Sequence, residues 1–449
     1  MSYSEKVSVL LRNKTTELFI RCLFLICLFV ICLLMGYNTG LLALILAAGC
    51  YFVFVKQGPE LPLWLSIIFL LPIRIPVTFL GEDYQIKLLF FGFVLISLFS
   101  CKMRLLKEKE KPKLPLILPM LVLLVFFIIG AVRSDAPLPD KPYFLRSFIF
   151  RSIFLYLLLN IYGRKDLVRL IKAISASSIL MALLGIYQHI FKSYFMINCN
   201  LPEFRAMGTF DHPNVFALFV FIAGVLSVGM FFYSKALKSR IYFGAVFLLN
   251  FTALLMSYSR SLWLCLIAGL FLFFVMYNKK AVIILAGVML IILLLLPADL
   301  KNRFMNPVNL NDPSHQIRVG LIMNGLNIIK NNPVFGIGDG NSYYQYDKYK
   351  VRDTSVVRKI HTQLIMLTAE YGIAGLTVFL YLIVAVFLNM IKIIKLLDNK
   401  DRILQYALIS VFAGLLINAQ FNGNFFQESY VWLIMGFGLL PGIPANMHL

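Results

Sequence analysis

The feature that most constrains this chain is a series of long apolar runs that recurs from one end to the other. Each run has about 17 to 25 residues, enough for an α-helix to cross the roughly 30 Å hydrocarbon core of a bilayer. The runs lack the alternation of a barrel strand, and helices satisfy their own backbone in lipid. Hydrophobic residues make up 60% of the chain and charged residues 14%, which excludes a soluble globular domain. We therefore predict an all-α polytopic membrane protein.

About 12 to 14 transmembrane helices are expected, because the third candidate is interrupted by Pro72 and Pro76 and the last is short. The candidate spans run approximately Leu18–Met35, Gly40–Val55, Leu61–Leu80, Ile86–Ser100, Leu114–Val132, Phe144–Tyr162, Leu167–Phe191, Asn214–Tyr233, Ile241–Ser257, Ser261–Tyr277, Ala281–Pro297, Leu364–Ile391, Ile403–Ala419 and Tyr430–Leu440.

The formal charge of +21 would suggest a nucleic-acid partner in a soluble protein, but its distribution indicates orientation in a membrane. Lys and Arg gather in every second short loop, and the loops between are neutral or acidic. The main basic clusters are Lys102–Lys113, Arg164–Lys172, Lys235–Arg240, Lys279–Lys280 and Lys392–Arg402. The positive-inside rule makes these loops cytoplasmic, together with both termini. We therefore expect membrane lipids, and no nucleic acid, as partners.

One segment breaks the alternation of spans and short loops. Residues Ala298 to Ile360 are mostly polar, and the loop alternation places them on the outer side. Within them His315 to Asn331 has an amphipathic pattern ended by Asn332 and Pro333, which predicts a helix on the outer interface. The predicted organisation is an N-terminal bundle (1–297), a large outer loop (298–360) and C-terminal spans (361–449).

Arginines are concentrated in the outer half of the predicted membrane region. Arg74, Arg146 and Arg151 lie within spans, whereas Arg205, Arg260 and Arg318 lie in outer loops or at span ends. Arginine within a membrane is costly and indicates a functional site. Snorkelling toward lipid phosphates is the alternative explanation. If several converge, their guanidinium groups suit a multiply charged anion such as a lipid-linked pyrophosphate.

His361 is the histidine best placed for chemistry, since it opens the span that follows the outer loop. Its ordinary pKa near 6.5 suits proton transfer at neutral pH, although a structural role at a helix start is the alternative. Gly336 to Asn341 resembles a phosphate-binding turn, but no strand precedes it and no G-K-[ST] follows, so a tight turn is favoured. No cluster of metal-ligand spacing stands out on the outer side, and we predict no metal and no cofactor.

Four blocks together resemble the O-antigen ligase family. His361 and Thr362 are followed by Gly372 and Gly375 in the pattern H-T-x9-G-x-x-G, like the signature at the end of the large periplasmic loop of that family. The upstream blocks occur in the same order: Arg205 with G-T-F-D-H-P-N from Gly208 to Asn214, S-Y-S-R-S from Ser257 to Ser261, and Arg318 with N-N-P-V-F-G-I-G-D-G. Thr362 departs from the family, which usually has Asn, Ser or Gln there.

This resemblance implies a glycosyltransferase that acts at the outer face of the bacterial cytoplasmic (inner) membrane. It would move a glycan from undecaprenyl pyrophosphate to an acceptor hydroxyl, without metal or nucleotide sugar. His361 would be the catalytic base or orient the acceptor, and Arg205, Arg318 and Arg260 would bind the pyrophosphate. Arg151 and Arg74 are further candidates for that role.

Ligation to a lipid A core is slightly favoured over polymerisation, in which another lipid-linked repeat is the acceptor. A transporter of the same lipid-linked glycan is the alternative from another functional class. Inverted repeats would support it, and no convincing internal repeat is visible.

Overall fold

The computed structural model describes residues 76–79, 82–85, 113–135, 143–192, 204–210, 212–295, 313–354, 357–423 and 425–440. The chain divides into two compact units, Met1–Pro112 with Thr209–Asp211, and Lys113–Gly208 with His212–Leu449. The predicted spans Leu18–Met35, Gly40–Val55 and Ile86–Ser100 lie outside the described residues, as does Arg74.

The described part of the first unit is an antiparallel hairpin. β1 (Pro76–Phe79) pairs with β2 (Glu82–Gln85), with Val77 opposite Tyr84. β1 lies at the end of the predicted third span, so the prediction of a helix up to Leu80 is wrong at these residues. Pro76 cannot donate a helical hydrogen bond, and β-branched Val77 and Thr78 favour a strand.

In the second unit, helices occupy all ten predicted spans, and the prediction of a helical polytopic protein is confirmed. They are α6 (Ile117–Val132), α7 (Tyr143–Ile161), α8 (Leu167–Phe191), α9 (Pro213–Tyr233), α10 (Leu237–Met256), α11 (Arg260–Tyr277), α12 (Lys279–Leu295), α17 (Gln363–Leu396), α18 (Asn399–Asn422) and α19 (Ser429–Gly438). Short 3-10 turns, η3 (Arg164–Asp166) and η4 (Phe425–Gln427), precede α8 and α19. Among the described residues, α8, α9, α10, α11, α17 and α18 are long and apolar enough to cross a membrane. The chain is a multi-pass membrane protein.

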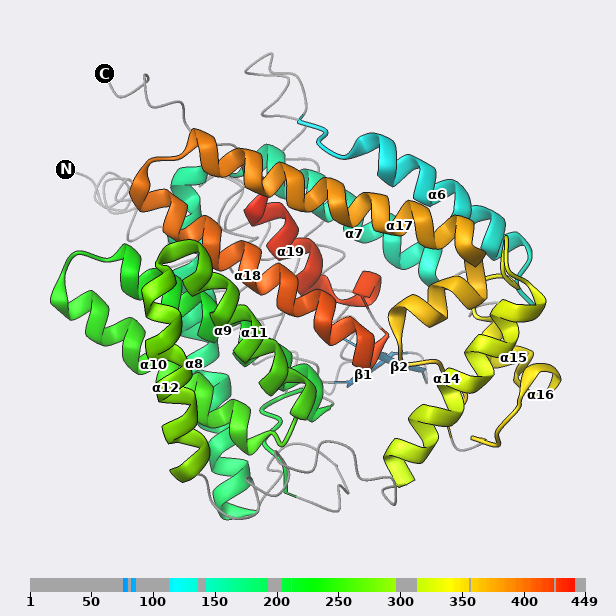
Figure 1. Ribbon diagram of the computed structural model, residues 1–449, viewed down its shortest axis with the longest axis horizontal. Coiled ribbons are helices and arrows are strands. Elements are labelled where there is room, and N and C mark those ends of the chain that lie inside the picture. The colour runs from blue at the N-terminus through cyan, green and yellow to red at the C-terminus, as the bar shows by residue number, and fades with distance from the viewer. Residues whose placement is uncertain are drawn as a thin grey trace, which may run out of the picture. The chain divides into compact units, whose positions relative to one another are not determined.

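The core of this unit lies around α9, which is buried along nearly all its length. Figure 1 shows α9 among α8, α10 and α11, with α18 beside it, and α9 packs against all four. Small residues allow the close approach: a Cβ on Gly414 of α18 would lie 2.3 Å from the Phe221 ring, and one on Gly229 would lie 2.6 Å from Ala407. Such small-residue contacts are typical of membrane helix packing.

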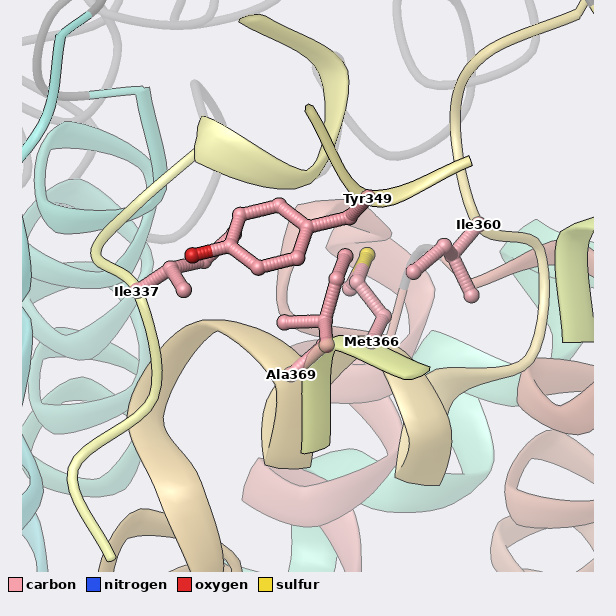
Figure 2. Packing of buried hydrophobic residues seen from close by; sticks show 6 residues of the cluster. Ile337, Tyr349, Ile360, Met366 and Ala369 are labelled. Carbon is pink, nitrogen blue, oxygen red and sulfur yellow. The ribbon is translucent and has the colours of Figure 1, made fainter. Parts of the chain in front are cut away.

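The segment between α12 and α17, which we call the outer segment after its predicted side of the membrane, folds onto the beginning of α17 from α14 onward. It contains α14 (Pro313–Asn331), which confirms the predicted amphipathic helix, and the short helices α15 (Asn341–Tyr344) and α16 (Tyr346–Tyr349). Ile328 of α14 joins a buried cluster made of Ile337, Tyr349, Ile360, Met366 and Ala369 (Figure 2). The buried face of α14 therefore packs on protein, whereas amphipathicity alone suggests a lipid contact. The division of the chain at residues 297 and 360 remains a prediction.

Candidate functional site

The arginine side of the candidate site is built at the start of α9 and α11. Arg205 is half-buried, and its Nε donates to the backbone carbonyl of Ser257 at 2.7 Å. Its Nη2 donates to Oδ1 of Asn214 at 3.2 Å, and the Ser259 hydroxyl donates to the same oxygen at 3.0 Å. The structure thus brings Arg205 and the Gly208–Asn214 block to the Ser257–Ser261 block, which lies far from them in the sequence.

A buried glutamine binds the turn that follows Arg205, which we call the Arg205 turn. Gln188 of α8 accepts from the backbone nitrogens of Met207 (3.2 Å) and Gly208 (2.8 Å) through Oε1, and donates to the Gly208 carbonyl (2.6 Å) through Nε2. Gly208 has φ +58°, and a Cβ there would lie 3.1 Å from the Phe216 ring. A glycine is therefore required by both backbone and space. Sequence reasoning missed Gln188, whose position inside an apolar span was the available signal.

His212 begins α9 as its N-cap residue. Its Nδ1 accepts a hydrogen bond from the backbone nitrogen of Asn214 at 3.0 Å, and Pro213 occupies the first turn, where its missing N–H costs nothing. Because Nδ1 is the acceptor, the neutral ring carries its proton on Nε2. The sequence favours His361 among the histidines, and the structure gives His212 a separate role as the cap of the helix that carries Asn214.

The histidine side of the site is joined to the arginine side through the end of α18. Asn214 Nδ2 donates to Asn422 Oδ1 at 3.4 Å, and Asn422 Nδ2 donates to Asn418 Oδ1 at 2.6 Å. The helix ends at Gly423, with φ +61°, where a Cβ would lie 2.8 Å from the His361 carbonyl oxygen. Sequence reasoning missed Asn418 and Asn422. The signal was two asparagines four residues apart on one face of an apolar helix.

His361 lies two residues before the first residue of α17 and is partly buried. Burial lowers the pKa of its imidazole below the ordinary value, and the positive charges of Arg318 and Lys359 lower it further, as does His212. A hydrogen bond to the Asn422 backbone carbonyl raises the pKa of His361. The net effect keeps the ring neutral at neutral pH, when it can accept a proton.

Arg318 reaches this site from α14, which is fastened to the segment that follows it. Asn324 Oδ1 accepts from the backbone nitrogens of Val351 (2.7 Å) and Arg352 (3.0 Å), and Asn324 Nδ2 donates to the Arg352 carbonyl (2.9 Å). A Cβ on Gly325 would lie 2.4 Å from Ile365 of α17, so α14 lies close against that helix. This docking positions Arg318 near enough for its charge to act on His361.

The glycine segment from Gly336 to Gly340 crosses a break in α17. Gly372 has φ 70° and ψ −176°, and this break leaves backbone groups that pair with the segment. Ile337 and Gly338 donate to the carbonyls of Ala369 (3.0 Å) and Glu370 (2.9 Å). The segment is therefore a docking element. It begins after the helix end at Asn331, as the favoured turn interpretation predicted.

Two buried carboxyl groups lie at this crossing, one on each side of it: Asp339 in the glycine segment and Glu370 in α17. Glu370 and Asp339 are 2% and 3% exposed, and the Ser342 hydroxyl donates to Glu370 Oε1 at 2.6 Å. Arg133 of the α6 terminus donates to the carbonyls of Phe335 (3.0 Å) and Gly336 (2.9 Å) from the other side. These bonds hold the outer segment between α6 and α17.

The other predicted arginines take separate positions. Arg151 of α7 donates to the backbone carbonyls of Ser147 (3.4 Å) and Gln427, and Gln427 Oε1 accepts from Lys359 at 3.4 Å. Arg260 begins α11 directly after Ser259 and is half-buried. The side chain of Arg146 lies outside the described part of the structure. Among the described residues, no group of three or more His, Cys, Asp or Glu side chains is arranged to hold a metal ion.

Residues 245–380 match the family model described as O-antigen ligase. The resemblance to the O-antigen ligase family is confirmed. The matched stretch contains the S-Y-S-R-S block, Arg318, the glycine segment and the His361 motif. Arg205 lies before the matched residues 245–380. It is assigned to the site because it donates hydrogen bonds to Ser257 and Asn214.

The chain is also similar to the teichuronic acid biosynthesis protein TuaE of Bacillus subtilis (strain 168). The two are 24% identical over 314 residues, which cover 63% of this chain and 62% of that protein. The match thus spans about three fifths of the length of this relative.

Proposed function

We propose that this protein transfers a glycan from undecaprenyl pyrophosphate to an acceptor hydroxyl at the outer face of the bacterial cytoplasmic membrane. The observation that carries the proposal is one polar network, in which Arg205 is linked through Asn214 and Asn422 to the turn that holds His361. It unites the candidate anion-binding side chain and the candidate base.

On the donor side, Arg205, Arg318 and Arg260 supply positive charge for the pyrophosphate. As the glycosidic bond breaks, negative charge develops on the leaving pyrophosphate oxygen. Fixed guanidinium groups in a poorly hydrated site stabilise that charge without reorganising. Arg205 donates hydrogen bonds to the Ser257 carbonyl at the end of α10 and to Asn214 of α9, which gives it the required fixed orientation. Arg151 donates to the Gln427 carbonyl, and the Gln427 side chain accepts from Lys359. Arg151 therefore stabilises the turn before α19.

On the acceptor side, His361 takes the proton. The acceptor oxygen attacks the anomeric carbon of the donor sugar, and the bond from that carbon to the pyrophosphate oxygen breaks. The bonding electrons leave with the pyrophosphate, and the hydroxyl proton passes to the neutral imidazole. The positive neighbours that lower the pKa of His361 also keep it unprotonated in the free enzyme.

Two acceptors are compatible with this chemistry. The family model is described as O-antigen ligase, which favours ligation; the acceptor we propose for it is a lipid A core. The similarity to a protein of teichuronic acid biosynthesis favours the synthesis of a polysaccharide; the acceptor we propose in that case is a second lipid-linked repeat. The donor half of the site is the same in both cases.

The proposal is tested with purified protein, an undecaprenyl-pyrophosphate-linked glycan and each acceptor in turn, without nucleotide. His361→Ala should lower turnover by about 10²- to 10⁴-fold while donor binding is retained. His448→Ala, which removes a histidine that belongs to none of the motif blocks, is the matched control. A monodisperse His361→Ala protein with full specific activity would remove the catalytic assignment. Movement of the donor across vesicles without product would instead favour a transporter.

A further inference from the structure

Asn214 is the residue at which the two halves of the candidate site meet. Its Oδ1 accepts from Arg205 (3.2 Å) and from the Ser259 hydroxyl (3.0 Å), and its Nδ2 donates to Asn422 (3.4 Å). Its backbone nitrogen donates to the ring of His212 at 3.0 Å. One residue therefore contacts groups from the Arg205 turn, from the Ser257–Ser261 block and from the end of α18.

The chemistry of an amide suits this junction. Its oxygen is an acceptor and its nitrogen a donor. With Arg205 and Ser259 both donating to one end, the oxygen must face them, and the nitrogen is then directed at Asn422. A carboxylate in this place could not donate to Asn422, and an apolar side chain of similar size could bind neither side.

The partners of Asn214 distinguish it from residues that only stabilise the fold. Gln188 is fully buried, and its side chain bonds to backbone atoms of one turn. Asn214 is half-buried at the site, and all three of its side-chain partners are other polar side chains. Its contacts therefore set the orientation of polar groups at the site.

We propose that Asn214 is the positioning residue that holds the Arg205 guanidinium in register with the turn at Asn422, whose backbone binds His361. This inference rests on the proposed function, because it assigns pyrophosphate binding to Arg205 and proton transfer to His361. Its consequence is that donor binding and turnover both depend on a side chain that takes part in neither directly.

The variants are Asn214→Ala, Asn214→Asp and the matched control Asn160→Ala. Asn160 forms three hydrogen bonds of similar length at the end of α7, with Lys113 and Tyr156. Undecaprenyl pyrophosphate without glycan is the binding probe, and turnover is measured with the linked glycan. Asn214→Ala should weaken probe binding about ten-fold, the usual size of a lost hydrogen bond to a charged group. Turnover should fall about 100-fold, as expected for a misplaced reacting group.

Asn214→Asp separates the role of the Asn214 amide oxygen from that of its amide nitrogen. It keeps the acceptor for Arg205 and Ser259, loses the donor to Asn422, and sets a carboxylate against the guanidinium that should bind phosphate. Probe binding should weaken at least as much as in Asn214→Ala, although the side chain has the same size. Because it is isosteric, this variant decides the question if Asn214→Ala gives little folded protein.

Double variants provide the readout that a purely structural role would not change. Asn214→Ala should cost little further binding or turnover in an Arg205→Ala background, because the positioned guanidinium is already absent, whereas in a His361→Ala background it should still weaken probe binding. Equal losses in every background, with a lowered melting temperature, would overturn the inference and leave the proposed function intact. Wild-type protein that does not bind the probe, or that binds it equally after Arg205→Ala, would overturn both.

Discussion

Replacing Gly372 with alanine tests how the outer segment is held on α17 and whether that attachment serves the site. Gly372 has φ 70° and ψ −176°, a backbone conformation that is essentially restricted to glycine. An added Cβ would lie 2.0 Å from the Val334 carbonyl oxygen, and backbone atoms of Val334 and Phe335 are its nearest neighbours. Because backbone cannot rotate away as a flexible side chain can, the crossing segment must move.

The size of the effect follows from two contributions. The strained conformation costs about 1–3 kcal/mol for a residue with a side chain. Displacement of the segment also breaks the bonds from Ile373 to the Pro333 carbonyl (2.8 Å) and from Ala374 to the Val334 carbonyl (3.3 Å). Each such bond contributes about 0.5–1.5 kcal/mol. Gly372→Ala should therefore lower the free energy of unfolding by about 2–6 kcal/mol.

Gly287→Ala is the matched control within the same chain. Gly287 lies in α12, and a Cβ there would meet no atom within 4 Å. Alanine should be neutral or stabilise the helix by about 0.5–1 kcal/mol. Both variants are compared with wild type by thermal unfolding of purified protein in detergent, followed by tryptophan fluorescence.

The variant also has a functional consequence. The displaced segment follows α14 directly, so its movement should shift Arg318 away from His361. Activity per folded molecule should fall for Gly372→Ala and stay constant for Gly287→Ala. A Gly372→Ala protein with the melting temperature and specific activity of wild type would refute the structural reasoning.

Four other predictions concern the site and its side of the membrane. In the free enzyme kcat/KM should fall as the pH drops through the pKa of His361, below its ordinary value of 6.5, because protonation removes the base. Arg318→Ala should move that inflection to higher pH, since the loss of a nearby positive charge makes protonation easier, and an unchanged inflection would place Arg318 away from the ring. Activity should survive EDTA, because arginines balance the pyrophosphate charge; loss of turnover restored by Mg²⁺ or Mn²⁺ would contradict this. A cysteine introduced at Asn309 should react with a membrane-impermeant reagent in intact cells, and labelling only after the membrane is breached would reverse the orientation.

In the part of the chain from residue 113 onward that the structure describes, the sequence alone determined the membrane helices to within a few residues. The predicted span Leu167–Phe191 coincides with α8. Helix α9 ends at Tyr233 as predicted and begins at Pro213, one residue before the predicted start. A membrane makes this possible, because each spanning segment must satisfy its own backbone and expose apolar side chains, and both demands are local. The strand at Pro76–Phe79 departs from the rule where proline and β-branched residues outweigh hydropathy.

The tertiary structure decided which of the candidate residues lie close together. Hydropathy and motifs marked Arg205 and His361, but Arg205 is linked to the end of α18 only through Asn214 and Asn422. Arg318 comes near His361 because α14 packs against α17, and these helices are distant from α9 along the chain. Hydrogen bonds between side chains depend on distances of a few tenths of an ångström, and the packing of whole helices sets those distances. A periodic pattern carries no information about such distances, so Asn214 and Asn422 acquire their roles only when the helices are assembled.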